Sequence, residues 1–230
     1  MTTPTDSDRE AHRKVRELYD DAGSARAYST KFSGTDKSQR EQACIARAFA
    51  DVPRGSKVLH LPCGAGRMTT FLVGLGFDVT AADLSADMVR LAREKCVAEF
   101  GEEETAARLN FAVMDILDIP LPDDTFDAVL CNRLLHHYPT AALRRGALSE
   151  LARVTRGPVV ASFFSNFALD SLKFHVLKAV SGRNKGHRFP CSTRTFLSDV
   201  DAAGLEVSVV EPVRFVVSPQ TYVKAYPSAS

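Results

Sequence analysis

Short apolar runs alternate with longer amphipathic segments through most of the chain. The runs have the length of strands, and the segments between them carry apolar residues at helical spacing. This alternation predicts strands at residues 57–61, 77–82, 110–114, 126–131 and 158–164. It predicts helices at residues 39–49, at 66–75, at 86–99 after an N-cap at Ser85, at 141–154 after an N-cap at Thr140, and from Ser192 or Thr193 to Gly204.

The order of these elements indicates an α/β fold. Buried strands that alternate with helices form a mainly parallel sheet covered on both faces, so we expect a doubly wound sheet. Two further strands are predicted at residues 205–210 and 221–225, which makes a seven-stranded sheet. Only about ten residues join these two strands, which is short for a parallel crossover, so an antiparallel C-terminal edge is expected.

The segment before the first strand is more polar than the rest. Residues 9–19 have a polar helical pattern, and residues 28–38 are rich in Gly, Ser and Thr, which is typical of a loop. Ser38 followed by Glu41 has the spacing of a capping box. We therefore expect the helix at 39–49 to begin directly after Ser38.

The composition argues against several functional classes of protein. The net charge is +1, and a near-neutral chain lacks the broad basic surface of a nucleic-acid-binding protein. No apolar run reaches the roughly 18 residues that span a bilayer. The five cysteines are an odd number without a CxxC pair, which favours reduced thiols and a cytoplasmic location. The oligomeric state is left open.

A glycine turn follows the first predicted strand. Gly64 and Gly66 stand between residues 57–61 and a helix, and glycine lets backbone and ligand approach closely. The helix start adds free N–H groups and a positive dipole end. Ligands of open α/β sheets bind at this edge, where the strand order reverses. By itself the pattern is equally compatible with a tight turn that binds nothing.

Carboxylates close the next two strands. Asp83 ends the second strand, where an acidic residue can accept hydrogen bonds from two ribose hydroxyls. Its simpler interpretation is a helix cap. Asp115 and Ile116 follow the third strand, where a carboxylate can accept from an adenine amine while an aliphatic chain packs on the ring. A solvated loop aspartate is the alternative there.

The fourth strand ends at Asn132 and is followed by Leu-Leu-His-His-Tyr at residues 134–138. Taken together, these four segments resemble the class I S-adenosylmethionine-dependent methyltransferases, especially the branch that acts on quinone precursors and other small molecules. The resemblance covers residues 57–160 well and the last third weakly. It implies a Rossmann-like fold, a cofactor of S-adenosylmethionine, and methyl transfer to a small-molecule or lipid-like acceptor.

The resemblance also implies roles for individual residues. The glycine turn holds the methionine portion, the second-strand acid the ribose, and the third-strand acid the adenine, while residues 1–52 form a helical lid on a cofactor-binding domain at 53–230. The cofactor-binding residues it implies are His60, Cys63, Gly64, Gly66, Asp83, Leu84, Met88, Asp115, Ile116, Asn132 and Tyr28.

Two residues depart from the family pattern. His60 stands where the family usually has an acid, and Pro62 where it usually has a glycine. Histidine does not supply a carboxylate's pair of acceptors, and proline lacks a backbone N–H. These departures support one rival interpretation, a degenerate fold that binds a ligand without turnover. Another rival is a nicotinamide-dependent oxidoreductase, but its fingerprint requires Gly or Ala where Thr69 stands.

Histidine is also the side chain best suited to remove a proton from an acceptor near neutral pH. His136 and His137 follow the strand whose end faces the expected methyl-transfer site, so we predict one of them, preferably His136, as the general base. The alternative is that both only fix the loop. No metal site is expected, because adjacent histidines on a helix point apart and do not chelate one ion together.

Overall fold

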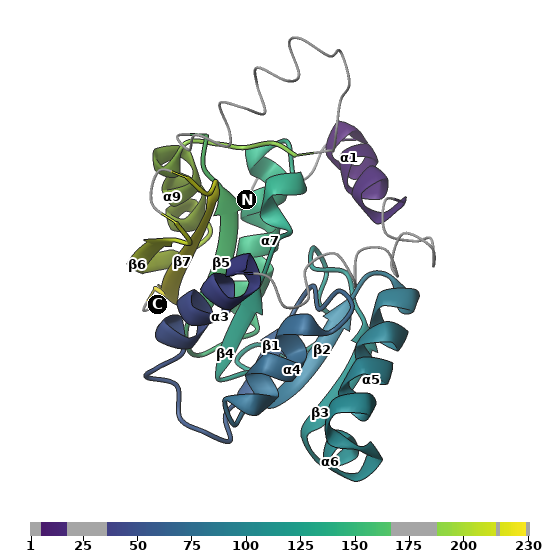
Figure 1. Ribbon diagram of the computed structural model, residues 1–230. Helices are drawn as coiled ribbons and strands as arrows, with labels where there is room; N and C mark the ends of the chain where they lie inside the picture. Colours follow the sequence, from purple (N-terminus) through teal and green to yellow (C-terminus); the bar gives the residue numbers. More distant parts are fainter. Residues whose placement is uncertain (1–5, 18–35, 167–187, 215–216, 229–230) are drawn as a thin grey trace.

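The computed structural model describes residues 6–17, 36–166, 188–214 and 217–228 (Figure 1). All seven predicted strands are present in one sheet with the order β3-β2-β1-β4-β5-β7-β6. They are β1 (Lys57–His60), β2 (Asp78–Asp83), β3 (Leu109–Val113), β4 (Ala128–Cys131), β5 (Val159–Phe164), β6 (Leu205–Pro212) and β7 (Gln220–Pro227).

The sheet is mainly parallel with an antiparallel edge, as the sequence predicts. The first five strands pair in parallel, whereas β7 is antiparallel to both β5 and β6. The strand order reverses between β1 and β4, because β2 and β3 follow on one side of β1 and β4 begins on the other. This is the switch point at which doubly wound sheets bind their ligands.

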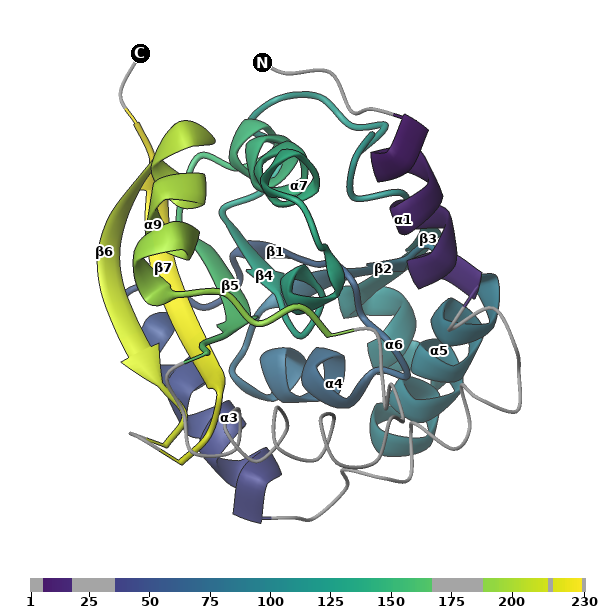
Figure 2. The same ribbon diagram turned by 90° about the horizontal axis from the view of Figure 1, so that it is seen from above.

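Helices cover both faces of the sheet, and Figure 2 shows α7 and α9 on one face with α3, α4 and α5 on the other. Each face has its own apolar core, with Leu148 and Phe196 in one and Ile45 and Leu72 in the other. The helices are α1 (Asp6–Glu17), α3 (Asp36–Ala48), α4 (Arg67–Gly74), α5 (Ala86–Phe100), α6 (Glu102–Arg108), the 3₁₀ helix η1 (Leu135–His137), α7 (Ala141–Arg153) and α9 (Thr193–Ala202).

The sequence locates most helix starts correctly. Ser85, Thr140 and Ser192 each cap a helix, since each side-chain oxygen accepts from the backbone N–H three residues later. The capping box at Ser38 is wrong: α3 begins at Asp36, so Ser38 and Glu41 lie inside the helix and face other partners. The short helix α6 was not predicted.

Among the described residues, no helix is long and apolar enough to cross a membrane.

Candidate functional site

The glycine turn lies between β1 and α4 at the switch point, and its two glycines have different tasks. Both adopt the left-handed backbone region, with φ of 51° at Gly64 and 82° at Gly66. A Cβ at Gly66 would lie 2.8 Å from the Cα of Ala92, so this glycine lets α4 pack on α5. A Cβ at Gly64 would meet nothing within 4 Å. Gly64 therefore exposes the turn to open space, which a ligand can fill.

Asp83 fastens this turn to the next strand. Its Oδ2 accepts from the backbone N–H of Gly64 at 2.9 Å, and its Oδ1 accepts from the N–H of Ser85 at 3.1 Å. Burial raises the pKa of Asp83, and backbone donors oppose that rise. Asp83 is not the helix cap, because Ser85 has that role. A carboxylate oxygen accepts more than one hydrogen bond, so Asp83 retains capacity for further donors.

Other predicted cofactor residues surround the same turn. Cys63 is buried, and its backbone N–H donates to the carbonyl of Ala82 at 2.7 Å, a second link between the turn and β2. Met88 packs with Ala65 beneath the turn, and Leu84 directly follows Asp83. The turn is thus held from two sides before any ligand binds.

His60, at the end of β1, is buried and uncharged. Its Nδ1 lies 2.9 Å from the hydroxyl of Thr69. Burial, and then the positive charge of Arg67, lowers the pKa of His60 to about 3. Where the resemblance leads us to expect a carboxylate, this chain therefore has a neutral, buried imidazole at the base of the site.

Asp115 lies beyond β3 and contacts the N-terminal helix. Its Oδ1 accepts from the N–H of Leu117 at 2.9 Å, and the Nε2 of His12 lies 3.0 Å from its Oδ2. Because a carboxylate only accepts, His12 donates from Nε2, and its Nδ1 lies 3.1 Å from the hydroxyl of Tyr138. The neighbouring Ile116 is buried. Through His12, helix α1 thus contacts the carboxylate that is predicted to bind the adenine. The sequence did not identify His12 as a site residue.

A buried ionic cluster, also missed from the sequence, joins α3 to the start of α4. Glu41 pairs with Arg67, whose guanidinium also donates to the hydroxyl of Ser38 at 2.7 Å. The other oxygen of Glu41 lies 3.7 Å from Arg133. The sequence contained one indication of this cluster. Glu41 is a charged residue on the face of α3 whose later positions, such as Cys44, are apolar and buried.

The side chain of Asn132, directly after β4, is buried and hydrogen-bonds to side chains of neighbouring strands. Its Oδ1 accepts from the hydroxyls of Ser162 at 3.1 Å and Tyr222 at 3.0 Å, and from the amide of Gln220 at 3.2 Å. The next residue, Arg133, has a φ of 63° and donates its backbone N–H to Ser162 at 2.8 Å. The side chain of Asn132 therefore ties β4 to β5 and β7.

His136 and His137 lie in η1, and both are buried. The ring of His136 stacks on Phe164 with 3.7 Å between centroids, and the ring of His137 lies 4.2 Å from it. Burial is the main reason that the pKa of His136 lies well below its usual range. His136 is thus unprotonated, but this environment disfavours the protonated form that a general base must adopt. Its predicted catalytic role stays a prediction.

Tyr28, which was expected to cover the cofactor, lies outside the described residues. Among the residues that the structure describes, no three His, Cys, Asp or Glu side chains gather as a metal ion would require.

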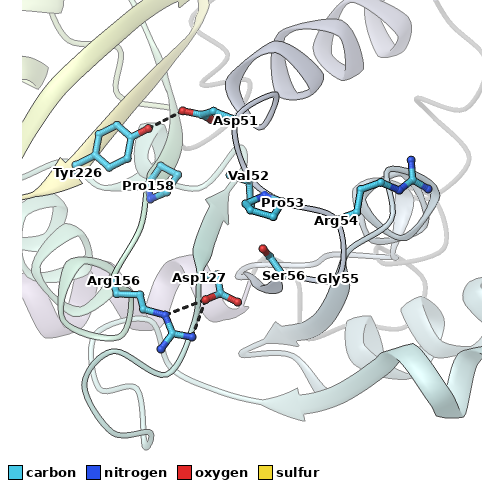
Figure 3. A pocket seen from close by; sticks show the side chains of 10 residues that line it. All are labelled: Asp51, Val52, Pro53, Arg54, Gly55, Ser56, Asp127, Arg156, Pro158 and Tyr226. Carbon is cyan, nitrogen blue, oxygen red and sulfur yellow. Dashed lines mark hydrogen bonds and ion pairs between the residues drawn. The ribbon is translucent and has the colours of Figure 1, made fainter.

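A cavity at the opposite edge of the sheet is distinct from this site (Figure 3). It lies at the amino ends of β1 and β5, and both carboxylates that line it already have partners. Asp127 pairs with Arg156, and Asp51 accepts from the hydroxyl of Tyr226 at 2.9 Å. The chemistry-bearing residues predicted from the sequence are absent from its lining.

Comparison with known proteins agrees with this geometry. Residues 58–157 match the family model described as a methyltransferase domain. A demethylmenaquinone methyltransferase of Clavibacter sepedonicus is 30% identical over 154 residues, which cover 66% of this chain and 58% of the relative. A ubiquinone biosynthesis O-methyltransferase of Xanthomonas axonopodis pv. citri is 33% identical over 95 residues, which cover 40% of this chain and 37% of the relative.

The chain therefore spans less than two thirds of the length of either relative. Among solved structures, the magnesium protoporphyrin IX methyltransferase of Synechocystis PCC 6803 with bound SAH has a TM-score of 0.74 at 19% identity. The match covers 94% of this chain and 100% of that one, and it shows that the two share a fold. Residues 58–157 are thus similar to the methyltransferase-domain family, and the chain shares its fold with the magnesium protoporphyrin IX methyltransferase.

Proposed function

We propose that this protein transfers a methyl group from S-adenosylmethionine to a small-molecule or lipid-like acceptor. The observation that carries the proposal is the bond between Asp83 and the backbone of Gly64 at the strand-order reversal. That bond brings an acidic residue and an open glycine turn together at the edge where doubly wound sheets bind ligands.

The residues present fit the cofactor. Gly64 leaves open space at the turn, and Asp83 retains capacity for the ribose hydroxyls. Asp115 would accept from the adenine amine with Ile116 against the ring. Arg67 begins α4, but its guanidinium is already paired with Glu41 and Ser38, so the methionine carboxylate would rely on the backbone N–H groups of the turn. Leu84 and Met88 would complete the apolar wall.

In this proposal the bound cofactor supplies a methyl group that is intrinsically reactive toward nucleophiles. The protein contributes binding, orientation and exclusion of water. Orientation of two reactants in a productive geometry can contribute about 7–11 kcal/mol in favourable cases. Such a site needs no metal or redox chemistry of its own.

Neither rival is favoured by a specific observation. A nicotinamide fingerprint requires a small residue at the position of Thr69, which here hydrogen-bonds to His60. A protein that binds the cofactor without turnover would be favoured by the presence of His60 where the family usually has an acid. However, the two other expected acids, Asp83 and Asp115, are present at and after the ends of their strands.

The names of the relatives support an aromatic, quinone-related acceptor for this chain. A cytoplasmic location is also proposed, because all five cysteines are unpaired and four of them are buried. Cell fractionation with an antibody to the protein tests the location.

Calorimetry tests the proposed function. S-adenosylmethionine and S-adenosylhomocysteine should bind, the oxidised nicotinamide cofactor should not, and Asp87→Ala, a partly exposed position on α5, should bind as the native protein does. Tighter binding of the nicotinamide cofactor would overturn the proposal. Binding without methyl transfer to any phenol, carboxylate, amine or quinol tested would favour the binding-protein alternative.

A further inference from the structure

A buried carboxylate lies between two arginines that come from opposite sides of the strand-order reversal. Glu41, on α3, is 1% exposed. It pairs with Arg67, the first residue of α4 after the glycine turn. It also faces Arg133, which lies two residues beyond the end of β4. One negative group therefore serves two largely buried cations that flank the switch point.

The contact between Glu41 and Arg133 is a contact of charges. The Oε1 atom of Glu41 lies 3.7 Å from Nη1 of Arg133 and makes no hydrogen bond to any residue that the structure describes. The other oxygen, Oε2, accepts from the guanidinium of Arg67. Burial of a carboxylate costs free energy, and a hydrogen bond compensates for it at only one of the two oxygens. Glu41 thus contributes its negative charge, rather than a hydrogen bond, to Arg133.

The charges of this cluster act on groups at the base of the site and inside the sheet. Burial, and then the positive charge of Arg67, lowers the pKa of His60 at the end of β1. Burial raises the pKa of the Tyr222 hydroxyl on β7, and the charge of Glu41 adds to that rise. The charges of Arg67 and Arg133 oppose it. At Tyr222, therefore, Glu41 offsets both arginines.

A positively charged ligand is sensitive to this balance. In the proposed function, the glycine turn holds the methionine portion of S-adenosylmethionine, and the methyl group faces the end of β4. The positive sulfonium would then lie at the same edge of the sheet as the two arginines, which repel it. S-adenosylhomocysteine has the same amino acid portion but a neutral sulfur, so it lacks this repulsion.

On the basis of the proposed function, we propose that Glu41 is a specificity residue, whose negative charge offsets Arg67 and Arg133 and so permits a positively charged cofactor to bind beside them. The effect requires no contact between Glu41 and the cofactor, because charges in a largely buried site act over several ångströms. A carboxylate that only tied α3 to the sheet would instead matter equally for the charged and the neutral ligand.

The test compares two ligands of the full chain by calorimetry. A general loss of stability or shape weakens S-adenosylmethionine and S-adenosylhomocysteine alike, so the ratio of their dissociation constants isolates the effect of charge. Glu41→Gln keeps the shape of the side chain but makes the cluster one unit more positive. At separations of about 10 Å, one unit charge changes an affinity by on the order of tenfold. We expect this variant to weaken S-adenosylmethionine relative to S-adenosylhomocysteine by at least about threefold.

Two further variants test the charge itself. Arg67→Gln makes the cluster one unit more negative and should shift the ratio by at least about threefold in the opposite direction. The double variant, Glu41→Gln with Arg67→Gln, restores the native charge, so its ratio should return to within about twofold of the native value. Arg93→Gln, an exposed arginine on α5, controls for charge elsewhere on the surface and should leave the ratio unchanged.

Equal weakening of both ligands in Glu41→Gln would overturn the proposal, because Glu41 would then only tie α3 to the sheet. A double variant that fails to recover the native ratio would also overturn it. If Glu41→Gln does not fold, Arg67→Gln decides: a ratio that stays unchanged, or that moves against S-adenosylmethionine, overturns the proposal.

The same measurements separate this inference from the proposed function. If the native protein binds neither ligand, the methyltransferase proposal fails and this inference fails with it. If the native protein binds both ligands but the ratio is constant across the variants, only the role of Glu41 is overturned.

Discussion

The two halves of the site are held together in different ways. In the half formed by β1, β2 and β3, the carboxylates of Asp83 and Asp115 accept from backbone N–H groups close to the glycine turn or to themselves. In the half formed by β4, β5 and β7, Asn132 bonds to side chains from distant parts of the chain. Backbone donors are supplied by almost any sequence, so the first half depends on few residue identities.

This difference explains how much could be predicted from the sequence. The glycine turn and Asp83 were predicted because their contacts follow from a strand, a turn and a helix in succession. Ser38 and Glu41 were misread as a capping box, since their true partner, Arg67, is far along the chain and only the fold brings it near. The contact between His12 and Asp115 was missed for the same reason.

Gly66→Val should have the largest effect, because it disturbs the turn on which the first half depends. The valine would place its Cβ against the backbone of Ala92 in a left-handed conformation. Overpacking costs about 1–3 kcal/mol and the backbone region about 1–2 kcal/mol, so the free energy of unfolding should fall by roughly 2–5 kcal/mol. Denaturant titration measures this.

Gly64→Ala is the matched control for that change, because its new Cβ meets open space. It should lose only the backbone contribution of about 1–2 kcal/mol, while cofactor affinity falls. Equal destabilisation by the two variants would contradict the separate roles of the two glycines.

Asn132→Ala tests the half that depends on side chains. The change leaves Ser162, Gln220 and Tyr222 without their shared acceptor, so the free energy of unfolding should fall by on the order of 3 kcal/mol. If Asn132 only ties the strands, the folded variant binds S-adenosylhomocysteine as before. If the variant is instead as stable as the native protein but binds S-adenosylhomocysteine more weakly, Asn132 is a cofactor-binding residue, as the resemblance implies.

His60 makes the base of the site sensitive to acid. Its pKa is about 3 in the folded protein, against about 6.5 in the unfolded chain. The unfolded chain therefore binds more protons below pH 6.5, and stability is lost as pH falls through that value. Between pH 6.5 and 4 the loss from His60 should be about 3 kcal/mol.

Denaturant titrations at several pH values measure this loss, with His60→Gln as the comparison. The variant should be less stable at pH 7 but should show a shallower decline toward pH 4. A decline of unchanged slope would assign the acid sensitivity to other groups, of which buried His136 is the first candidate.

Asp83→Ala tests the half that depends on the backbone. The change removes the acceptor that we propose for two ribose hydroxyls, and it removes the acceptor for the N–H of Gly64. Two bonds to a charged group contribute roughly 1.5–3 kcal/mol each, so cofactor affinity should fall by on the order of 100-fold. Calorimetry with S-adenosylhomocysteine measures it, with Asp87→Ala as the control, and unchanged affinity would remove Asp83 from the cofactor site.

His12→Ala should have the smallest effect, and it tests a contact that departs from this comparison. His12 is a distant side chain, yet it bonds to Asp115, a carboxylate that also accepts from nearby backbone. If α1 closes over the adenine end, loss of His12 removes a contribution of about 0.5–1.5 kcal/mol, and cofactor affinity falls roughly two- to tenfold. If His12 instead competes with the adenine amine for Asp115, the same variant binds the cofactor more tightly.

Lys14→Ala, an exposed position on the same helix, controls for changes in α1 itself and should leave affinity unchanged. Because the two mechanisms move the dissociation constant in opposite directions, even a change of about threefold in calorimetry decides whether α1 completes the adenine site or blocks it, and we expect weaker binding.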